Sequence, residues 1–197
     1  MEHDRHGAKQ PHRFDPTKAG LLDDRARFEA LPPAEIAALL DAPGGGLVVD
    51  FGTGTGSYAI ELAAARPDVT VVALDEQRPM LDRLEAKLAV RPLANVKPLL
   101  AGPDASRELA GRADRVLAVN VLHELGDAAL AQLAALLGPD GRALFVDWNA
   151  DVERTMGPPR DHVYSPAAAA ERLARFGFTE ESRRLFREHY ALVCRKS

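Results

Sequence analysis

The stretch Val48-Val49-Asp50-Phe51-Gly52-Thr53-Gly54-Thr55-Gly56 decides the fold of this chain. An apolar, strand-like run leads there directly into three alternating glycines, and glycine lets the backbone take a positive φ or approach a ligand closely. Residues 57–65 follow with the apolar spacing of a helix, and Ser57 is expected to be its N-cap. The stretch therefore predicts a strand, a tight glycine turn and a helix, the arrangement of a nucleotide-binding corner.

A second strand, residues 69–74, ends in Asp75, which places a carboxylate at the sheet edge beside the glycine turn. Carboxylates in this position accept hydrogen bonds from ribose hydroxyl groups. The G-x-G-x-x-G/A fingerprint of dinucleotide sites fits poorly, because counting from Gly52 the sixth position is Ser57. A G-x-x-x-x-G-K-[ST] phosphate loop is absent, and residues 47–65 contain no Lys or Arg. The pattern favours a nucleoside ligand without phosphates.

The D-x-G-x-G-x-G run from Asp50 to Gly56, together with the acidic strand end at Asp75, resembles the cofactor motifs of class I S-adenosylmethionine-dependent methyltransferases. Residues 113–125 (ADRVLAVNVLHEL) look like the fourth-strand motif of that superfamily, and residues 136–147 (LLGPDGRALFVD) like its glycine turn and fifth strand. These segments occur in the order that the superfamily has, so the resemblance covers nearly the whole chain.

Shorter runs resemble a group of small bacterial and archaeal methyltransferases, related to the ubiquinone/menaquinone-biosynthesis methyltransferase-like group. They are residues 12–16 (HRFDP), Leu22-Asp23-Asp24-x-x-Arg27, Asp147-Trp148, residues 157–159 and Tyr164-Ser165. The resemblance implies transfer of a methyl group from S-adenosylmethionine to a small-molecule acceptor, and it does not identify that acceptor.

Apolar periodicity predicts alternating strands and helices, and therefore an α/β fold with a parallel sheet covered on both faces. The expected strands are residues 47–51, 69–74, 96–101, 115–119 and 142–147, the expected helices 34–40, 57–65, 79–90, 127–137 and 167–176, and a final strand pair 178–186 and 189–194. Only residues 106–110 are left for a helix between the third and fourth strands, so that helix is expected to be short or irregular.

The resemblance implies a three-layer Rossmann-like sandwich. Its seven-stranded, mostly parallel sheet would have the order 3-2-1-4-5-7-6, with strand seven antiparallel. We expect residues 1–33 to form an N-terminal tail and a short cap, and residues 34–197 to form the methyltransferase domain.

Composition narrows the range of partners. The formal net charge of −4 provides no broad attraction for phosphate backbones, which argues against a nucleic-acid substrate. No apolar run approaches the ~18 residues of a membrane span, and the polar N-terminus does not read as a signal peptide, so we expect a cytoplasmic protein. Cys194 is the single cysteine, which excludes an intrachain disulfide and a thiolate metal cluster within one chain. We expect no metal. We also expect the protein to be a monomer or a homodimer.

Ten residues are candidates for holding the cofactor. Asp50 would orient the glycine turn and contact the methionine amino group, Asp104 would lie near the adenine amine, and Asn120 would line the pocket near the sulfonium. Asp50 could instead stabilise the turn, and Asn120 could be a satisfied strand-end amide. The full candidate set is Asp50, Gly52, Thr53, Gly54, Gly56, Asp75, Glu76, Asp104, Ala105 and Asn120.

The acceptor side of the site is expected at the carboxyl ends of the fourth and fifth strands. His123 is the candidate general base, because histidine titrates near neutral pH, with Asp147 as the next candidate. A packed histidine that braces the turn is the alternative, and Glu124 is expected to be structural or solvent-facing. Candidates for contact with the acceptor are Trp148, Arg160 and Tyr164.

Three other functions compete with this interpretation. The first is an NAD-dependent oxidoreductase, which Ser57 disfavours, and the second is a non-catalytic S-adenosylmethionine-binding module. The third is a nucleic-acid methyltransferase. Amino-directed DNA enzymes carry an Asn/Asp-Pro-Pro-aromatic tetrapeptide after strand four, whereas this chain has Asn120-Val121-Leu122-His123.

Overall fold

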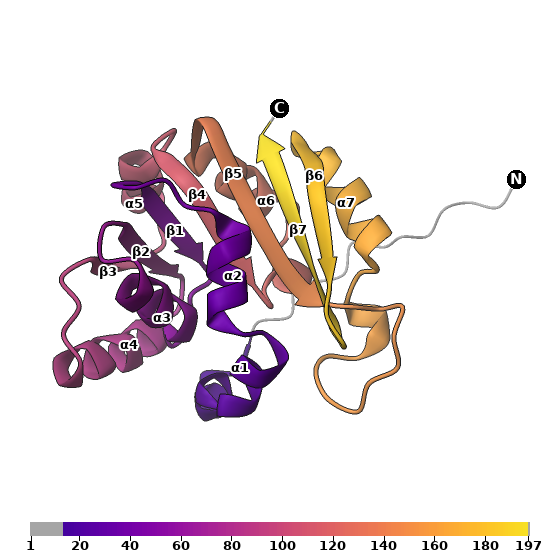
Figure 1. Ribbon diagram of the computed structural model, residues 1–197, viewed down its shortest axis with the longest axis horizontal. Helices are drawn as coiled ribbons and strands as arrows, with labels where there is room; N and C mark the ends of the chain where they lie inside the picture. The colour runs from indigo at the N-terminus through magenta and orange to yellow at the C-terminus, as the bar shows by residue number, and fades with distance from the viewer. Residues whose placement is uncertain (1–13, 197) are drawn as a thin grey trace, which may run out of the picture.

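Seven strands form one sheet in the part of the chain that the computed structural model describes, residues 14–196. The order is β3-β2-β1-β4-β5-β7-β6 (Figure 1), and β7 runs antiparallel to both β5 and β6 while the other pairs are parallel. The predicted order and the antiparallel strand seven are confirmed. The strands are β1 Leu47–Phe51, β2 Thr70–Asp75, β3 Val96–Leu100, β4 Ala113–Val119, β5 Leu137–Trp148, β6 Phe178–Leu185 and β7 His189–Lys196.

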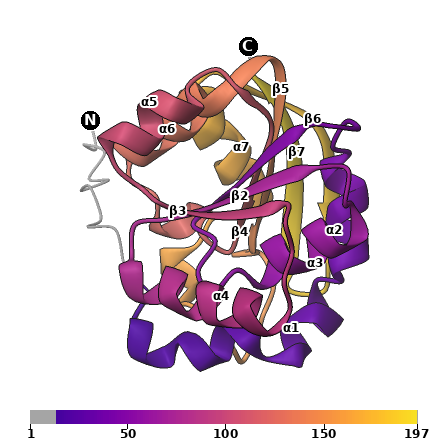
Figure 2. The ribbon, with the colours of Figure 1, turned by 90° about the vertical axis from the view of Figure 1, so that its left-hand side faces the viewer.

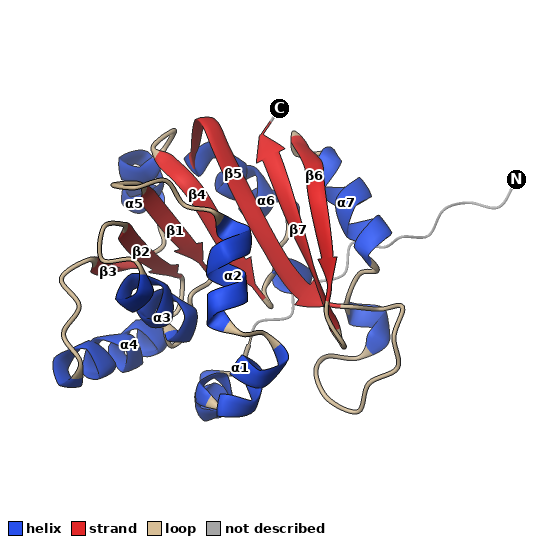
Figure 3. Ribbon diagram, in the orientation of Figure 1, coloured by secondary structure: helices blue, strands red, loops and turns tan. Residues whose placement is uncertain are grey.

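Helices cover both faces of this sheet and give three layers (Figures 2 and 3). Side chains alternate between the faces of a strand, so Val48 packs into the core beneath α2, α3 and α4, and Val49 into the core beneath α5, α6 and α7. The helices are α1 Arg25–Ala30, α2 Pro33–Leu40, α3 Ser57–Ala65, α4 Arg78–Val90, α5 Pro103–Leu109, α6 Asp127–Leu136 and α7 Pro166–Ala174, with short 3-10 helices η1 Pro16–Asp23, η2 Leu122–Glu124 and η3 Arg160–His162.

Two local expectations need correction. Ser57 is not the N-cap of α3: Gly56 is, with φ 76°. The single Ser57 O–H instead has two acceptors within reach in a distant segment, Asp23 Oδ1 at 2.8 Å and the Leu22 carbonyl at 3.1 Å. The fifth strand is longer than residues 142–147, because it begins at Leu137 and its pairing with β4 shifts register between Ala113 and Arg115. The helix after β3 is short, as expected, and starts at Pro103, where a missing N–H costs nothing.

Residues 14–31, here called the cap, lie at the carboxyl edge of the parallel strands (Figure 1). Asp23 fastens the cap to the glycine turn, since its carboxylate accepts hydrogen bonds from the Thr55 and Ser57 hydroxyls at 2.6 and 2.8 Å and pairs with Lys87. The Asp24 carboxylate accepts the Ala26 N–H and so caps α1. Residues 1–13, which include the start of the expected tail and of the HRFDP run, lie outside the described residues. Within residues 14–196, no helix is long and apolar enough to cross a membrane.

Candidate functional site

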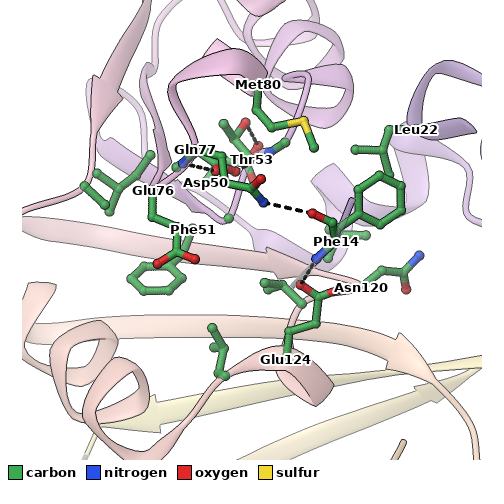
Figure 4. A pocket seen from close by; sticks show the side chains of 18 of the residues that line it. Phe14, Leu22, Asp50, Phe51, Thr53, Glu76, Gln77, Met80, Asn120 and Glu124 are labelled. Atoms are coloured by element: carbon green, nitrogen blue, oxygen red, sulfur yellow. Dashed lines mark hydrogen bonds between the residues drawn. The ribbon is translucent and has the colours of Figure 1, made fainter. Parts of the chain in front are cut away.

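A cavity of about 250 Å³ lies at the carboxyl edge of the parallel strands, where ligands bind in sheets of this type. Its walls are the ends of β1, β2 and β4, the start of α6 and the cap. Figure 4 shows Asp50, Thr53 and Gln77 on one side of it and Asn120 and Glu124 on the other. The backbone of Phe14 spans the two sides: its carbonyl accepts from Gln77 Nε2 at 3.2 Å, and its N–H donates to Glu124 Oε2 at 3.3 Å.

The glycine turn shapes the floor of the cavity. Gly52 and Gly54 line the cavity, and Gly54 has a φ of +56° that residues with a Cβ rarely adopt. A Cβ on Gly54 would lie 2.9 Å from Leu22 Cδ1 of the cap. Gly56 does not line the cavity; a Cβ there would lie 2.3 Å from Leu84 Cδ1, so this glycine lets α4 pack against the turn.

Asp75 joins the second strand to the turn. Its Oδ2 accepts the Gly54 N–H at 2.8 Å and its Oδ1 accepts the Gln77 N–H at 2.8 Å. Burial raises the pKa of this carboxyl, and the two backbone hydrogen bonds partly offset the effect. Because an ionised carboxylate offers about four acceptor sites, both oxygens can still accept hydrogen bonds from a ligand in the cavity, which Asp75 and the neighbouring Glu76 line.

Asp50 and Asn120 lie at the ends of the adjacent strands β1 and β4. Asp50 is buried and accepts the Thr53 hydroxyl at 2.6 Å; burial, together with repulsion from Asp75, raises its pKa to about 6. Asn120 has a φ of 55°, a strained value for a residue other than glycine. Its Oδ1 is buried in the cavity wall and has no hydrogen-bond partner among the described residues. A buried acceptor left unpaired is costly, so this wall is suited to a ligand that donates a hydrogen bond.

Behind the cavity, three ionisable side chains stand in a row. His123 Nδ1 lies 2.8 Å from Asp147 Oδ1, and the His123 N–H donates to Asp147 Oδ2 at 2.9 Å. On the other side of the ring, Nε2 lies 3.6 Å from Glu124 Oε1. Asp147 and His123 are buried and do not line the cavity, whereas Glu124 does. The cavity-facing group of this row is therefore Glu124.

The protein environment shifts the pKa values of His123 and Glu124. Burial acts to lower the pKa of His123, but the charge and hydrogen bond of Asp147 outweigh it and the net shift is upward. Burial raises the pKa of Glu124 to about 7, with His123 and the Phe14 N–H acting in the opposite direction. Glu124 can thus take up or release a proton near neutral pH.

Besides Gly56, His123 and Asp147, five more candidate residues do not line the cavity. Asp104 is exposed and pairs with Arg107, while Ala105 is buried in the core. Trp148 stacks on His189 at 3.9 Å between ring centroids. Arg160 donates to the Ala150 carbonyl, and Tyr164 lies beneath the Arg172 guanidinium.

Sequence reasoning did not assign Phe14, Leu22, Arg27 or Gln77 to the site, although all four line the cavity. The available signals were the HRFDP run, which contains Phe14, and the Leu22-Asp23-Asp24-x-x-Arg27 run; both supported a family resemblance without a role for these residues. Hydrogen bonds between segments more than 30 residues apart bring the cap over the turn, and no local pattern encodes them.

A family model described as a methyltransferase domain matches residues 24–192. The chain belongs to this family. It is also similar to the solved structure of a SAM-dependent methyltransferase from Aquifex aeolicus, with 25% identity, a TM-score of 0.84, and coverage of 94% of this chain and 100% of that chain. The protein is a class I S-adenosylmethionine-dependent methyltransferase.

Two further solved structures share the fold of this methyltransferase. One is a putative type 11 methyltransferase from Sulfolobus solfataricus, at 23% identity and a TM-score of 0.65, covering 86% of this chain and 92% of that chain. The other is a putative methyltransferase in complex with the Haloferax volcanii Trm112 methyltransferase activator, at 14% identity and a TM-score of 0.72, covering 92% and 96%.

Proposed function

We propose that this methyltransferase transfers the methyl group of S-adenosylmethionine to a small molecule that enters the cavity beneath the cap. The observation that carries the proposal is the arrangement of three residues around that cavity. Asp75 is a carboxylate that can accept further hydrogen bonds, Gly54 leaves the backbone open to a ligand, and Asn120 Oδ1 is a buried acceptor without a partner among residues 14–196. The family match favours methyl transfer over hydride transfer to a nicotinamide, which was the first alternative.

The residues present fit a nucleoside cofactor. Asp75 would accept hydrogen bonds from the ribose hydroxyls, and Gly52 and Gly54 would admit the cofactor close to the backbone. Asp50 and Asn120 Oδ1 would accept hydrogen bonds from its amino group. When bound, the cofactor supplies a methyl group that is already activated for an in-line displacement, so positioning accounts for much of the rate acceleration.

An acceptor that is a phenol, an amine or an acidic carbon must also lose a proton. We assign this step to the Glu124 carboxylate, because it faces the cavity. His123 and Asp147 would position Glu124 from behind and adjust its proton affinity, which replaces direct proton removal by His123 in our proposal. Glu124 then holds the proton until solvent takes it.

A small acceptor is favoured over a nucleic acid by the formal net charge of −4 and by a cavity whose lining includes four carboxylates. The expectations of a cytoplasmic location, a monomeric or homodimeric state and the absence of a metal stay predictions. So do the placement of Asp104 and Ala105 at the adenine and of Trp148, Arg160 and Tyr164 at the acceptor.

Isothermal titration calorimetry tests the proposed cofactor. S-adenosylmethionine and S-adenosylhomocysteine should bind in the micromolar range, roughly −7 to −8 kcal/mol, and NAD should show no heat of binding. A metabolite screen that follows conversion to S-adenosylhomocysteine would then identify the acceptor. Binding of NAD without binding of S-adenosylhomocysteine would overturn the proposal.

A further inference from the structure

The cavity is strongly acidic. Four carboxylates line it, those of Asp50, Asp75, Glu76 and Glu124. Among the described residues of the lining, Arg27 is the only lysine or arginine. The amino-acid end of the proposed cofactor carries a carboxylate as well as an ammonium group, and that carboxylate would be repelled by the acidic lining unless a cation met it.

Arg27 has hydrogen-bonding capacity to spare. Its Nη1 donates to the Leu22 carbonyl at 2.6 Å, and its guanidinium lies 5.7 Å from the centre of the Tyr58 ring. Within residues 14–196, no carboxylate forms an ion pair with it. Burial lowers the pKa of the Arg27 guanidinium, and the charges of Asp23 and Asp50 and the Tyr58 hydroxyl offset this only in part. A guanidinium has five N–H donors in a planar fork that matches a carboxylate.

The position of Arg27 indicates which end of the ligand it meets. Asp75 ends β2, whose neighbours in the sheet are β3 on one side and β1 on the other. If Asp75 holds the ribose, one end of the cofactor therefore extends toward β3 and the other end toward β1 and β4. Arg27 lies 5.7 Å from the centre of the Tyr58 ring, on the helix that follows β1, and shares the cavity lining with Asp50 at the end of β1. Arg27 thus lies on the side of Asp50 and Asn120, where the amino-acid end is placed.

We propose that Arg27 binds the carboxylate of the cofactor's methionine moiety, so that the cap completes the cofactor site. This assignment rests on the proposed function. The proposal gives the residues of the Leu22-Asp23-Asp24-x-x-Arg27 run a common purpose. Asp23 binds the segment to the glycine turn, Asp24 caps α1, and Arg27 of α1 lines the cavity.

The test compares two ligands that differ at this end. S-adenosylhomocysteine carries the carboxylate, and 5′-methylthioadenosine lacks the whole amino-acid group. Calorimetry on Arg27→Met should show affinity for S-adenosylhomocysteine reduced about 10- to 100-fold, as expected for a charge-assisted contact, with affinity for methylthioadenosine within about twofold of wild type. Arg27→Lys should lie between the two, because lysine keeps the charge and loses the fork.

Arg25→Met is the matched control, since Arg25 is exposed on the same helix and does not line the cavity; it should bind both ligands normally. Equal losses for both ligands in Arg27→Met would overturn the proposal, because they would make Arg27 a brace of the cap. Unchanged binding of S-adenosylhomocysteine would overturn it too.

Should Arg27→Met fail to fold, the wild-type protein and Arg27→Lys test the proposal instead. The proposal requires that the wild-type protein bind S-adenosylhomocysteine more tightly than methylthioadenosine, and that Arg27→Lys reduce this preference. A wild-type protein that binds neither ligand would instead refute the proposed function.

Discussion

At the residue scale, two carboxylates that line the cavity, Asp75 and Glu124, differ in what surrounds them. Asp75 accepts two backbone N–H groups, so it both closes the turn and faces the cavity. Glu124 accepts one N–H, from the cap, and has a histidine behind it. The first environment favours a fixed acceptor of hydrogen bonds, and the second favours a group that exchanges a proton.

We expect Asp75→Ala to weaken binding of S-adenosylhomocysteine by roughly 10- to 100-fold, because charge-assisted hydrogen bonds to the ribose are worth about 1.5–3 kcal/mol. The same change leaves the Gly54 and Gln77 N–H groups without their acceptor, so a moderate loss of stability should accompany it. Calorimetry and urea unfolding measure the two effects. Asp82→Ala, on the exposed face of α4, is the control; normal binding by the Asp75 variant would place the cofactor elsewhere.

Glu124 should make stability depend on pH. Its pKa is about 7 in the folded protein against an ordinary value of 4.5, so its stabilising contribution is fully present below about pH 4.5 and is lost as the pH rises through 7. Glu124→Gln removes this term and should therefore gain stability relative to wild type between pH 5 and pH 8, by at most about 3 kcal/mol. Urea unfolding at both pH values measures the difference, and a pH-independent difference would contradict the shift.

The same residue should set the pH dependence of turnover. If Glu124 removes a proton from the acceptor, the wild-type rate should rise with pH through about 7, where the carboxylate forms. Glu124→Gln should lower turnover about 100- to 10,000-fold and leave affinity for S-adenosylmethionine within a few-fold. Initial rates with an identified acceptor measure this. A variant that turns over at the wild-type rate would reduce Glu124 to a structural carboxylate.

At the element scale, the cap closes the cavity, and both hydrogen bonds and the packing of Ala19, Phe28 and Leu31 hold it there. Asp23 bonds to two hydroxyls of the glycine turn and to Lys87 of α4, and Phe14 bridges Gln77 and Glu124 across the cavity. α1 has only six residues, and none of them is fully buried. An element of this kind opens at low free-energy cost unless such contacts fix it.

Asp23→Ala should therefore loosen the cap. We expect stability to fall by about 1–3 kcal/mol, since the Thr55 hydroxyl loses its acceptor, Lys87 loses its ion-pair partner and Ser57 keeps only the Leu22 carbonyl. Cleavage of residues 14–31 in limited proteolysis should become faster. Bound S-adenosylhomocysteine should slow that cleavage if Arg27 contacts it. Asp24→Ala, which removes only the N-cap of α1, is the comparison and should cost about 1 kcal/mol. Equal protease resistance in Asp23→Ala and wild type would show that other contacts hold the cap.

At the scale of the whole molecule, the cavity draws on β1, β2, β4, α6 and the cap, which come together only in the folded state. A ligand of this cavity consequently binds the folded protein and not the unfolded chain. Binding and global stability are linked for that reason.

S-adenosylhomocysteine at 100 times its dissociation constant should stabilise the folded protein by about 2.7 kcal/mol. For a domain of this size that corresponds to a rise in Tm of roughly 5–10 °C. Differential scanning calorimetry measures the shift, and Asp75→Ala at the same ligand concentration should show a smaller one. An equal rise with NAD would mean that the cavity does not distinguish the two nucleotides.

The sequence alone determined the sheet and the glycine turn after its first strand. The glycine turn, the apolar run before it and the acid at Asp75 are local features, and residues within a few positions of one another decide them. The superfamily resemblance supplied the strand order, and the structure confirmed it. These parts were predictable because short stretches of sequence determine the backbone conformation of a turn and the pattern of buried side chains along a strand.

Only the tertiary structure decided which side chains face the cavity beyond the end of β4. His123 turns away because Asp147, 24 residues later, binds both its ring and its backbone N–H, which leaves the cavity to Glu124. Arg27 reaches the site because Asp23 bonds to a turn more than 30 residues away. Such pairings depend on distances in space between segments remote in the chain, and no local pattern of residues specifies them.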